Sequence, residues 1–395
     1  MESFYRPTRV EVNLDALEHN VEAFRKALPE GTGLMAVVKA NAYGHGAVQV
    51  AREAEALGLQ YLGVALLDEA LELRRAGITL PILVLGYTPP EGLELAARND
   101  VTVNAFSREV LDALRERGGS RTGGEPVPPL KIHVKIDTGM GRLGLHDTNE
   151  AIAYIEEALR LPGVVVEGIF THYACADESD KSYTLEQHAK FVRVVNHFRE
   201  RGVTFPWVHA GNSATGFDTP ELTFNMLRLG ISLYGLYPSE EVRRERIALE
   251  PVMSLKSEIV HLKKLPPGSA ISYGATYRTS GEETIATLPI GYADGFSRML
   301  SGRAEALVRG RRVPIVGRIC MDQCMVRVDD APEAALHDEA VLLGSQGGER
   351  ITVEEIAEKL GTVNYEIVCM ISHRVPRIYI RGGRTVRIDN PLLGG

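Results

Sequence analysis

The sequence predicts an α/β fold, with an N-terminal (β/α)8 or TIM barrel over residues 11–244 and a mainly β domain over residues 245–395. Three observations lead to this prediction. First, short β-branched or apolar runs alternate with stretches of helical periodicity. Second, this repeat occurs eight times within about 230 residues. Third, the helical stretches nearly vanish after residue 245. A doubly wound open sheet is the alternative, but eight repeats over this length favour the closed barrel.

The eight apolar runs define the predicted strands of the barrel. They cover residues 33–39, 61–66, 82–86, 101–105, 131–138, 164–172, 205–210 and 226–232. Amphipathic segments such as AVQVAREAEALG and SREVLDALRERG lie between most of them and predict the outer helices. The segment 118–129, rich in Gly and Pro, is predicted to be a surface loop before the fifth strand.

The region after residue 245 has the pattern of a second, mainly β domain. Segments such as EETIATLPIGYA and RIYIRGGRTVRID read as strands joined by Gly/Pro turns, and only TVEEIAEKLG is clearly helical. The N-terminal TRVEVNL could pair with this domain, so residues 1–10 are a candidate addition to it.

Composition narrows the class of protein. The chain has 395 residues, 44% hydrophobic and 24% charged, with a net charge of −8 and no basic tail, which argues against a nucleic-acid partner. Its four cysteines show no disulfide framework, which fits a reducing compartment. With no apolar leader pattern and no run of 18 apolar residues, we expect a cytoplasmic protein without a membrane partner.

The ends of the predicted strands hold the candidate functional residues, because side chains at the C-terminal ends of barrel strands carry function. They are Lys39, Asp137, Arg142, His172, His209, Asn212, Ser213 and Arg228. Lys39 ends an apolar run, and a neutral amine in such a place can form a Schiff base with an aldehyde. The alternative is a lysine that only extends from the strand end to solvent, and the residues alone leave both open.

Three short patterns are rejected as sites. GMGRLG at 139–144 matches a dinucleotide fingerprint, but the following helix should start only after the glycines, capped by Asp147 or Thr148. Cys320 and Cys324 lack partners at zinc spacing. His172 with its near neighbours Cys175 and Asp177 has no second cluster to complete a coordination shell, so no metal site is predicted.

Nine motifs give the chain a resemblance that spans almost its whole length. They are AVVKANAYGHG, KIDTGMGRLG, THYACAD, HAGNSA, MLRLGISLYG, SYGATY, PIGYADG, GRICMDQCMV and NYEIVCMISHRVPR. In this order they resemble the alanine racemases, pyridoxal 5'-phosphate enzymes of fold type III. The resemblance implies interconversion of L-alanine and D-alanine by two bases acting at Cα of the pyridoxal-phosphate aldimine, supplying D-alanine for peptidoglycan.

The resemblance also implies the catalytic roles. Lys39 is expected to hold the cofactor as an internal aldimine and to move a proton on one face, with Tyr273 as the base on the opposite face. His172, hydrogen-bonded toward Arg228, is expected to assist Tyr273, because a phenol is otherwise a poor base. Arg228 is expected to face the pyridine nitrogen, which a guanidinium cannot protonate, so proton exchange is favoured over side reactions.

The remaining roles implied by the resemblance concern binding. The cofactor-binding set is Lys39, Tyr43, His172, Asn212, Ser213, Arg228, Gly230, Ile231 and Tyr365. The phosphate is expected at the loops after strands seven and eight. Arg142 and the backbone of Met321 are expected to meet the substrate carboxylate, and Lys135 is the candidate for carbamylation, which would make it an anion that orients Arg142.

The resemblance further implies a homodimer in which Tyr273 and Met321 complete the site of the neighbouring subunit. The chain departs from the common pattern at Phe170, where many members have tyrosine, and at His373. Serine or another small amino acid therefore stays open as a substrate beside alanine. An amino-acid decarboxylase would need an acid in place of Arg228, and a non-catalytic carrier of pyridoxal phosphate would lack the domain with Tyr273.

Overall fold

A computed structural model describes residues 4–117, 121–122, 125–126 and 128–393, and its chain forms two compact units. The barrel unit comprises Leu17–Ala42 and Ala47–Glu250. The β unit comprises Met1–Ala16, Tyr43–Gly46 and Pro251–Gly395. The short segment Tyr43–Gly46, which follows the Lys39 turn, therefore clusters with the C-terminal residues.

The barrel unit is built on eight parallel strands. They are β2 (Gly33–Val37), β3 (Tyr61–Val64), β4 (Ile82–Val84), β5 (Val101–Ala105), β8 (Leu130–Lys135), β9 (Val164–Phe170), β10 (Trp207–His209) and β11 (Met226–Leu229). Neighbours in this order pair in parallel from β2 through to β10, and β11 pairs in parallel with β2. This order of eight parallel strands, a near-barrel, confirms the predicted fold class.

The seam of the barrel lies between β10 and β11. Among the described residues these two strands share no regular ladder, although the Asn225 amide donates to the Val208 carbonyl at 3.2 Å. The Arg228 amide likewise donates to the Gly211 carbonyl at 3.2 Å. The last strand is therefore held mainly by β2, and its side chains face the loop that follows β10.

Several strands are shorter than the sequence predicts. The strand predicted at 33–39 ends at Val37, the one at 164–172 ends at Phe170, and the one at 226–232 ends at Leu229. At the first of these, the Tyr234 hydroxyl donates to the Val37 carbonyl at 2.9 Å, which fixes the point where the strand stops. Lys39 and His172 thus lie just beyond their strands, whereas His209 and Arg228 are the last and third residues of β10 and β11.

The predicted loop at 118–129 contains two short strands. Arg121–Thr122 (β6) and Glu125–Pro126 (β7) pair in antiparallel fashion. Residues 118–120, 123–124 and 127 of that loop lie outside the described residues.

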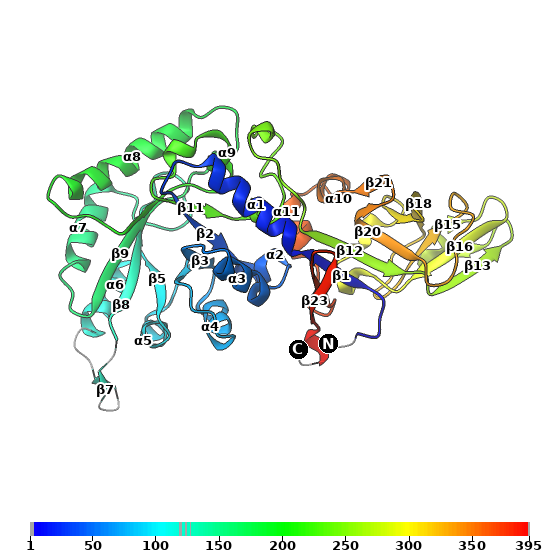
Figure 1. Ribbon diagram of the computed structural model, residues 1–395, viewed down its shortest axis with the longest axis horizontal. Helices are drawn as coiled ribbons and strands as arrows, with labels where there is room; N and C mark the ends of the chain where they lie inside the picture. The colour runs from blue at the N-terminus through cyan, green and yellow to red at the C-terminus, as the bar shows by residue number, and fades with distance from the viewer. Residues whose placement is uncertain (1–3, 118–120, 123–124, 127, 394–395) are drawn as a thin grey trace. The chain divides into compact units, whose positions relative to one another are not determined.

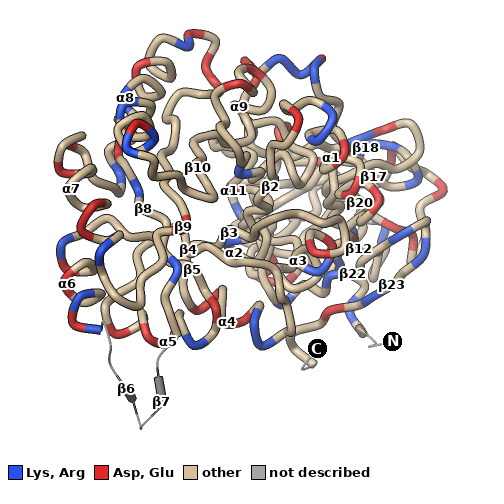
Figure 2. The backbone as a smooth tube through the Cα atoms, turned by 60° about the vertical axis from the view of Figure 1, so that its left-hand side comes forward, with Lys and Arg blue, Asp and Glu red and all other residues tan. Residues whose placement is uncertain are grey.

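Helices cover the outside of the barrel strands. They are α1 (Leu14–Ala27), α3 (Ala47–Ala56), α4 (Leu67–Arg75), α5 (Leu93–Arg98), α6 (Arg108–Arg117), α7 (Thr148–Ala158), α8 (Ser182–Arg199) and α9 (Ser213–Asp218). In Figure 1 the helices α4, α5, α7 and α8 lie outside the strands. Basic and acidic residues are interspersed along α6 (Figure 2), as expected of a solvated helix face. No helix in the described part of the chain is both long and apolar enough to cross a membrane.

The β unit is built on one large sheet. Its strand order is β13-β16-β19-β18-β17-β20-β12-β1-β22-β23, with β21 beside β20. The bounds are β1 (Arg9–Asn13), β12 (Met253–Glu258), β13 (His261–Leu265), β16 (Glu283–Leu288), β17 (Glu305–Val308), β18 (Arg311–Val316), β19 (Cys324–Arg327), β20 (Glu339–Gln346), β21 (Glu349–Ile351), β22 (Arg377–Arg381) and β23 (Arg384–Asp389). A separate ribbon pairs β14 (Ala270–Ile271) with β15 (Tyr277–Arg278), and two helices follow β21, α10 (Val353–Leu360) and α11 (Asn364–Cys369).

The N-terminal strand belongs to this sheet. β1 pairs with β12 in antiparallel fashion and with β22 in parallel, so it lies inside the sheet and both of its edges are used. Val10 and Val12 are fully buried, which gives the alternating burial of a strand with one face on a core.

Candidate active site

Lys39 begins a turn of unusual handedness. The turn α2 (Lys39–Tyr43) follows β2, and its residues Ala40, Asn41 and Ala42 have φ of 51 to 54° and ψ of 47 to 51°. Tyr43 also has a positive φ of 52°. A left-handed conformation costs roughly 1–2 kcal/mol per residue with a Cβ, so neighbouring contacts must hold this turn in place.

Glu69 supports this turn from within the barrel unit. One carboxylate oxygen accepts from the Ala40 amide at 2.7 Å, and the other accepts from the amides of Ala65 and Leu66 at 2.7 and 3.2 Å. Glu69 stands in the first turn of α4, where a carboxylate that bonds backbone amides also stabilises the helix start. A single side chain therefore joins the turn that carries Lys39 to the loop after β3.

Arg228 is buried on β11 and its guanidinium bonds only neutral groups. Nη1 donates to His209 Nδ1 at 2.8 Å, and Nη2 lies 3.0 Å from His172 Nδ1 and donates to the carbonyls of Thr171 and Ala210 at 2.9 and 2.8 Å. Among the described residues no carboxylate pairs with it. Burial lowers the pKa of Arg228 to about 9, so the guanidinium remains charged at neutral pH.

The two histidines beside Arg228 are neutral acceptors. Burial, followed by the charge of Arg228, holds the pKa of His172 and of His209 well below the ordinary value of 6.5. Because Nδ1 of His172 accepts from Arg228, its proton lies on Nε2, which is left as a hydrogen-bond donor. The hydrogen bond expected between His172 and Arg228 is thus present.

Lys135 lies at the end of β8 in the same cluster of cations. It is only 4% exposed, and burial lowers its pKa to about 7, helped by the charges of Arg228, Arg142 and Lys39 and opposed by that of Asp137. Lys135 is therefore within electrostatic range of three cations and one carboxylate. An ammonium group so placed is easily neutralised.

The aromatic ring of Phe170 packs against the Lys135 ammonium group. The ammonium nitrogen of Lys135 lies 4.6 Å from the ring centroid of Phe170, within cation–π range. The same ring stacks on His209, with centroids 4.8 Å apart and planes 11° apart, and it also contacts His133 and the Arg228 guanidinium. A phenylalanine offers its ring face to the lysine but no hydroxyl, so this departure from the family pattern touches the site directly.

The GMGRLG motif folds back on the end of β8. Asp137 accepts from the amides of Gly139 and Gly141 at 3.0 and 3.1 Å, and the Asp137 amide donates to the Leu145 carbonyl at 2.9 Å. A Cβ on Gly144 would meet the Asp137 amide nitrogen at 2.7 Å, so the close return requires glycine there. The following helix begins at Thr148 with Asp147 as its cap, which confirms the predicted helix start after the glycines.

The loops after β10 and β11 meet at Ser213. Its hydroxyl accepts from the amides of Gly230 and Ser232 at 3.0 and 3.5 Å, and Ser213 is the first residue of α9. Asn212 caps that helix, accepting from the Thr215 amide at 3.2 Å. Free amides at a helix start, a hydroxyl and the glycine backbone together suit a phosphate group.

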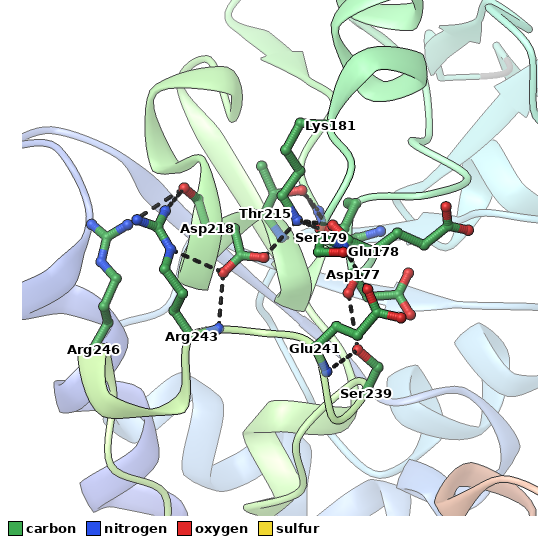
Figure 3. A network of polar contacts seen from close by, with 12 residues as sticks. Asp177, Glu178, Ser179, Lys181, Thr215, Asp218, Ser239, Glu241, Arg243 and Arg246 are labelled. Atoms are coloured by element: carbon green, nitrogen blue, oxygen red, sulfur yellow. Dashed lines mark hydrogen bonds and ion pairs between the residues drawn. The ribbon is translucent and has the colours of Figure 1, made fainter.

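A second polar network joins the loops after β9 and β10 to the segment after β11. Asp218, at the end of α9, receives the Lys181 ammonium group at 2.6 Å and the Arg243 amide at 3.0 Å (Figure 3). The same ammonium group donates to the Ala176 carbonyl at 2.8 Å. Because Asp218 is buried, this network fixes the loops after β9 and β10 that carry the candidate residues.

In the β unit, Tyr43 is held against Tyr365 of α11. The ring centroids are 6.2 Å apart, and burial, followed by the charges of Tyr365 and Cys369, raises the pKa of Tyr43 above its ordinary value. The Tyr43 phenol therefore remains a hydrogen-bond donor. Arg377, which is 2% exposed, fixes this segment by donating to the Gly44 carbonyl at 3.0 Å.

Arg377 also holds the chain around residue 373. It donates to three further carbonyls, those of Ile371, Ser372 and Val375, at 2.7 to 2.9 Å. The His373 side chain between them is exposed. Arg377 was not among the residues predicted from the sequence.

Tyr273 and Met321 are exposed in the β unit. Tyr273 begins a short turn (Tyr273–Ala275) between β14 and β15 and is 72% exposed, so it is not a residue of the regular sheet. Met321 is 53% exposed. Pocket-lining residues around Tyr273 include Ser272 and Cys320, whose side chains lie 3.5 Å apart.

The barrel thus brings together most residues predicted there and adds others that sequence reasoning missed. Glu69, His133 and Glu167 were not predicted. His133, Lys135 and Asp137 stand two residues apart, which places them on one face of a strand, and this spacing was a signal for His133. Glu167 interrupts a β-branched run, which was a signal too, whereas Glu69 has none in its amphipathic helix.

Comparisons with known proteins agree with this architecture. Residues 12–238 match the family "Alanine racemase, N-terminal domain", and residues 252–379 match "Alanine racemase, C-terminal domain". The alanine racemase of Desulforamulus reducens is 47% identical over 377 residues, covering 95% of this chain and 99% of that protein. Its coverage shows that the likeness extends over the whole chain and not only over the barrel.

Solved structures give the same result. The alanine racemase from Bacillus anthracis with bound L-Ala-P has a TM-score of 0.92 and 45% identity, covering 99% of this chain and 100% of that one. A histidine racemase from Leuconostoc mesenteroides has a TM-score of 0.87 and 30% identity, covering 96% of this chain and 100% of that one. With both family domains and full-length relatives matched, the chain belongs to the alanine racemase family.

Proposed function

We propose that the chain interconverts the L and D enantiomers of alanine with pyridoxal 5'-phosphate, using one base from the barrel unit and one from the β unit. The observation that carries the proposal is the position of Lys39 at the end of β2, among the charges that act on Lys135 and His172. Family membership supports the reaction class. As its role we propose the supply of D-alanine for peptidoglycan, in the cytoplasm, where four cysteines that form no disulfide fit a reducing environment.

The residues present fit the cofactor. Ser213, Gly230 and Ile231 are proposed to donate to the phosphate, for which the Gly230 amide would exchange its present bond to the Ser213 hydroxyl. The neutral phenol of Tyr43 and that of Tyr365 are further proposed donors. Asn212 is proposed to act by holding the start of α9. When bound through Lys39, pyridoxal phosphate supplies a conjugated imine that withdraws electrons from the Cα–H bond of the substrate.

Arg228 sets the proposed choice of reaction. Its guanidinium is buried and charged. It can donate a hydrogen bond to a ring nitrogen that faces it, but it does not transfer the proton to that nitrogen. A decarboxylase of this architecture would need a carboxylate there, but Arg228 bonds only His209, His172 and backbone carbonyls. This observation favours proton exchange over decarboxylation.

Two residues are proposed to move the substrate proton. The Lys39 amine takes or returns it on one face of Cα, and the Tyr273 hydroxyl acts on the other face, helped by the Nε2–H group of His172. Two faces need two bases, because a single base tends to return the proton to the side from which it came. Arg142 and the Met321 amide are proposed to hold the substrate carboxylate.

Lys135 is proposed to be carbamylated. Its pKa of about 7 leaves a large neutral fraction at physiological pH, and a neutral amine attacks carbon dioxide to form N–COO⁻ with release of one proton. The change turns a cation surrounded by Arg228, Arg142 and Lys39 into an anion, which removes their mutual repulsion. Mass spectrometry of the native protein at neutral pH, with and without bicarbonate, tests the added carboxylate.

We also propose a homodimer with shared sites, in which residues 11–244 bind the cofactor and residues 245–395 of the other subunit supply Tyr273 and Met321. The exposure of both side chains in the single chain supports this. A catalytic site excludes water, but the β unit of the same chain leaves Tyr273 and Met321 exposed to it. A second subunit would supply the missing cover.

Mixed dimers test both the reaction and the sharing. Lys39→Ala and Tyr273→Phe chains are purified separately, mixed, dissociated and reassociated, and alanine enantiomers are followed by circular dichroism. If the sites are shared, each mixed dimer has one site with both bases intact, so the mixture should recover about one quarter of wild-type activity. No recovery from a mixture shown to contain mixed dimers would refute shared sites, and an inactive wild-type holoenzyme would refute racemisation of alanine.

The substrate range is tested in parallel. The similar histidine racemase shows that this fold, at 30% identity, occurs with another amino acid. Alanine, serine and histidine are offered to the same holoenzyme, and we expect the highest kcat/KM for alanine.

A further inference from the structure

A chain of hydrogen-bonding side chains runs through the barrel from Arg228 to Glu167. Arg228 Nη1 lies 2.8 Å from His209 Nδ1, and His209 Nε2 lies 2.9 Å from His133 Nδ1. His133 Nε2 lies 3.5 Å from Glu167 Oε2, an ion-pair distance without full hydrogen-bond geometry, and no other acceptor reaches this buried nitrogen among the described residues. The Tyr61 hydroxyl donates to the same carboxylate oxygen at 2.5 Å.

The Glu167 end of this chain lies away from Lys39. Tyr61 is the first residue of β3, and its hydroxyl also lies 2.8 Å from the hydroxyl of Thr102, the second residue of β5. The contacts therefore begin near the N-terminal ends of the strands and finish at Arg228. His133, His209, Tyr61 and Thr102 are at most 1% exposed, so solvent does not supply alternative partners.

Only one arrangement of protons satisfies the whole chain. A guanidinium only donates, so His209 Nδ1 must be unprotonated and its proton lies on Nε2. His209 then donates to His133 Nδ1, which puts the proton of His133 on Nε2, pointing at the Glu167 carboxylate. The opposite arrangement would place two donors together at Arg228 and two acceptors together at Glu167.

We propose that Glu167 is a positioning residue for Arg228, acting through the fixed proton positions of His133 and His209. The inference rests on the proposed function only for the use made of Arg228. In the resulting relay, both imidazoles turn their unprotonated nitrogens toward the guanidinium. The oriented imidazole dipoles of the relay stabilise the buried charge of Arg228, which has no paired carboxylate among the described residues.

The charge state of the groups agrees with this arrangement. Burial lowers the pKa of His133, so the imidazole is neutral, as a relay of single protons requires. Burial alone would raise the pKa of Glu167, but the hydrogen bonds from His133 and Tyr61 bring it below its ordinary value. Glu167 is therefore an anion, and Tyr61 helps to keep it one.

The first measurement uses the protein without cofactor. Histidine is labelled with ¹⁵N, and the signals of His133 and His209 are assigned with His133→Gln and His209→Gln. In wild type both rings should carry their proton on Nε2. In Glu167→Leu the acceptor is gone, so a fraction of His209 should carry the proton on Nδ1. Tyr61→Phe is the matched control, since it removes the other partner of the carboxylate and should leave both rings unchanged.

The second measurement uses the holoenzyme. Glu167→Leu should lower kcat about tenfold, as expected when one buried hydrogen-bonding partner is lost, with Tyr61→Phe within about twofold of wild type. If Glu167→Leu does not fold, Glu167→Gln replaces it: the amide oxygen still accepts, but the His133 Nε2–H signal should move upfield because the charge is gone.

The relay is overturned if the histidine signals of Glu167→Leu, or of Glu167→Gln in its place, match wild type, or if Tyr61→Phe moves them as far. It is also overturned if the protons move and kcat of the active holoenzyme does not fall. Proton positions that shift as expected in a wild-type chain unable to racemise alanine would leave the relay standing and refute the proposed function instead.

Discussion

The two units present their candidate residues in opposite ways. In the barrel unit Arg228, Lys135 and His209 are buried, and each is fixed by several contacts. In the β unit Tyr273 and Met321 are 72% and 53% exposed, on short connecting segments. The barrel residues are arranged by their own unit before any ligand arrives, whereas the β-unit residues need something further to surround them.

This contrast separates two kinds of effect. Substitutions of the buried barrel residues should alter the reaction rate, the pKa values of neighbouring groups and the stability of the barrel unit. Changes at Tyr273 should leave the folded chain undisturbed and affect only the reaction, because the side chain has little packing to lose.

The largest expected effect comes from Lys39→Ala. Racemisation should fall by more than about 10⁴-fold, since one residue both holds the cofactor and transfers a proton, and proton transfer alone is worth about 10²–10⁴. Enantiomer exchange measured by circular dichroism checks this. Lys131→Ala is the control, because Lys131 lies on a barrel strand but bonds Asp100 at the surface. Residual activity near wild type would remove Lys39 from the mechanism.

Tyr273→Phe should reduce kcat by about 10²–10⁴-fold in both directions, the usual worth of a general base. Its melting temperature should equal that of wild type, which distinguishes the exposed β-unit residue from the buried barrel residues. Tyr277→Phe is the matched control from the same segment, since its hydroxyl bonds Glu283 at 2.6 Å. Racemisation at the wild-type rate in Tyr273→Phe would disprove the two-base scheme.

Glu69→Gln should lower kcat/KM about tenfold. The two carboxylate oxygens of Glu69 accept from three backbone amides, whereas a glutamine side chain has only one acceptor oxygen. Hydrogen exchange at the Ala40 amide should become faster in the same variant. Glu72→Gln, an exposed change on the same helix, is the control. Unchanged exchange at Ala40 would show that the turn does not depend on Glu69.

A different kind of effect, on stability and not on the reaction, is the pH dependence expected from Lys135. Its pKa is about 7 in the folded chain against an ordinary 10.5, so the unfolded chain binds more protons between these values. In carbon-dioxide-free buffer the stability of wild type should therefore rise with pH between 7 and 10 relative to Lys135→Met, by at most about 1.4 kcal/mol per pH unit. Urea unfolding of the cofactor-free protein at several pH values measures this. Parallel curves for the two proteins would contradict the lowered pKa.

The sequence predicted the barrel because eight repeats leave few other folds, and it located Lys39, His172 and Arg228 because each breaks an apolar run. It placed Lys39 within a strand, although Val37 is the last strand residue, since nothing in a run of alanine and valine announces a left-handed turn. It could not find Glu69, whose role depends on an amide 29 residues away in the chain. Tyr273 was reached only through a family resemblance.

The place of β1 in the sheet has a consequence for synthesis. This strand leaves the ribosome before the other described strands of its sheet, yet its parallel partner β22 begins at Arg377, roughly 360 residues later. At usual elongation rates it waits about 20–70 s with an unpaired edge, while the whole barrel is made and can fold. Truncation before β22 should therefore leave one side of β1 open and favour aggregation of the nascent chain.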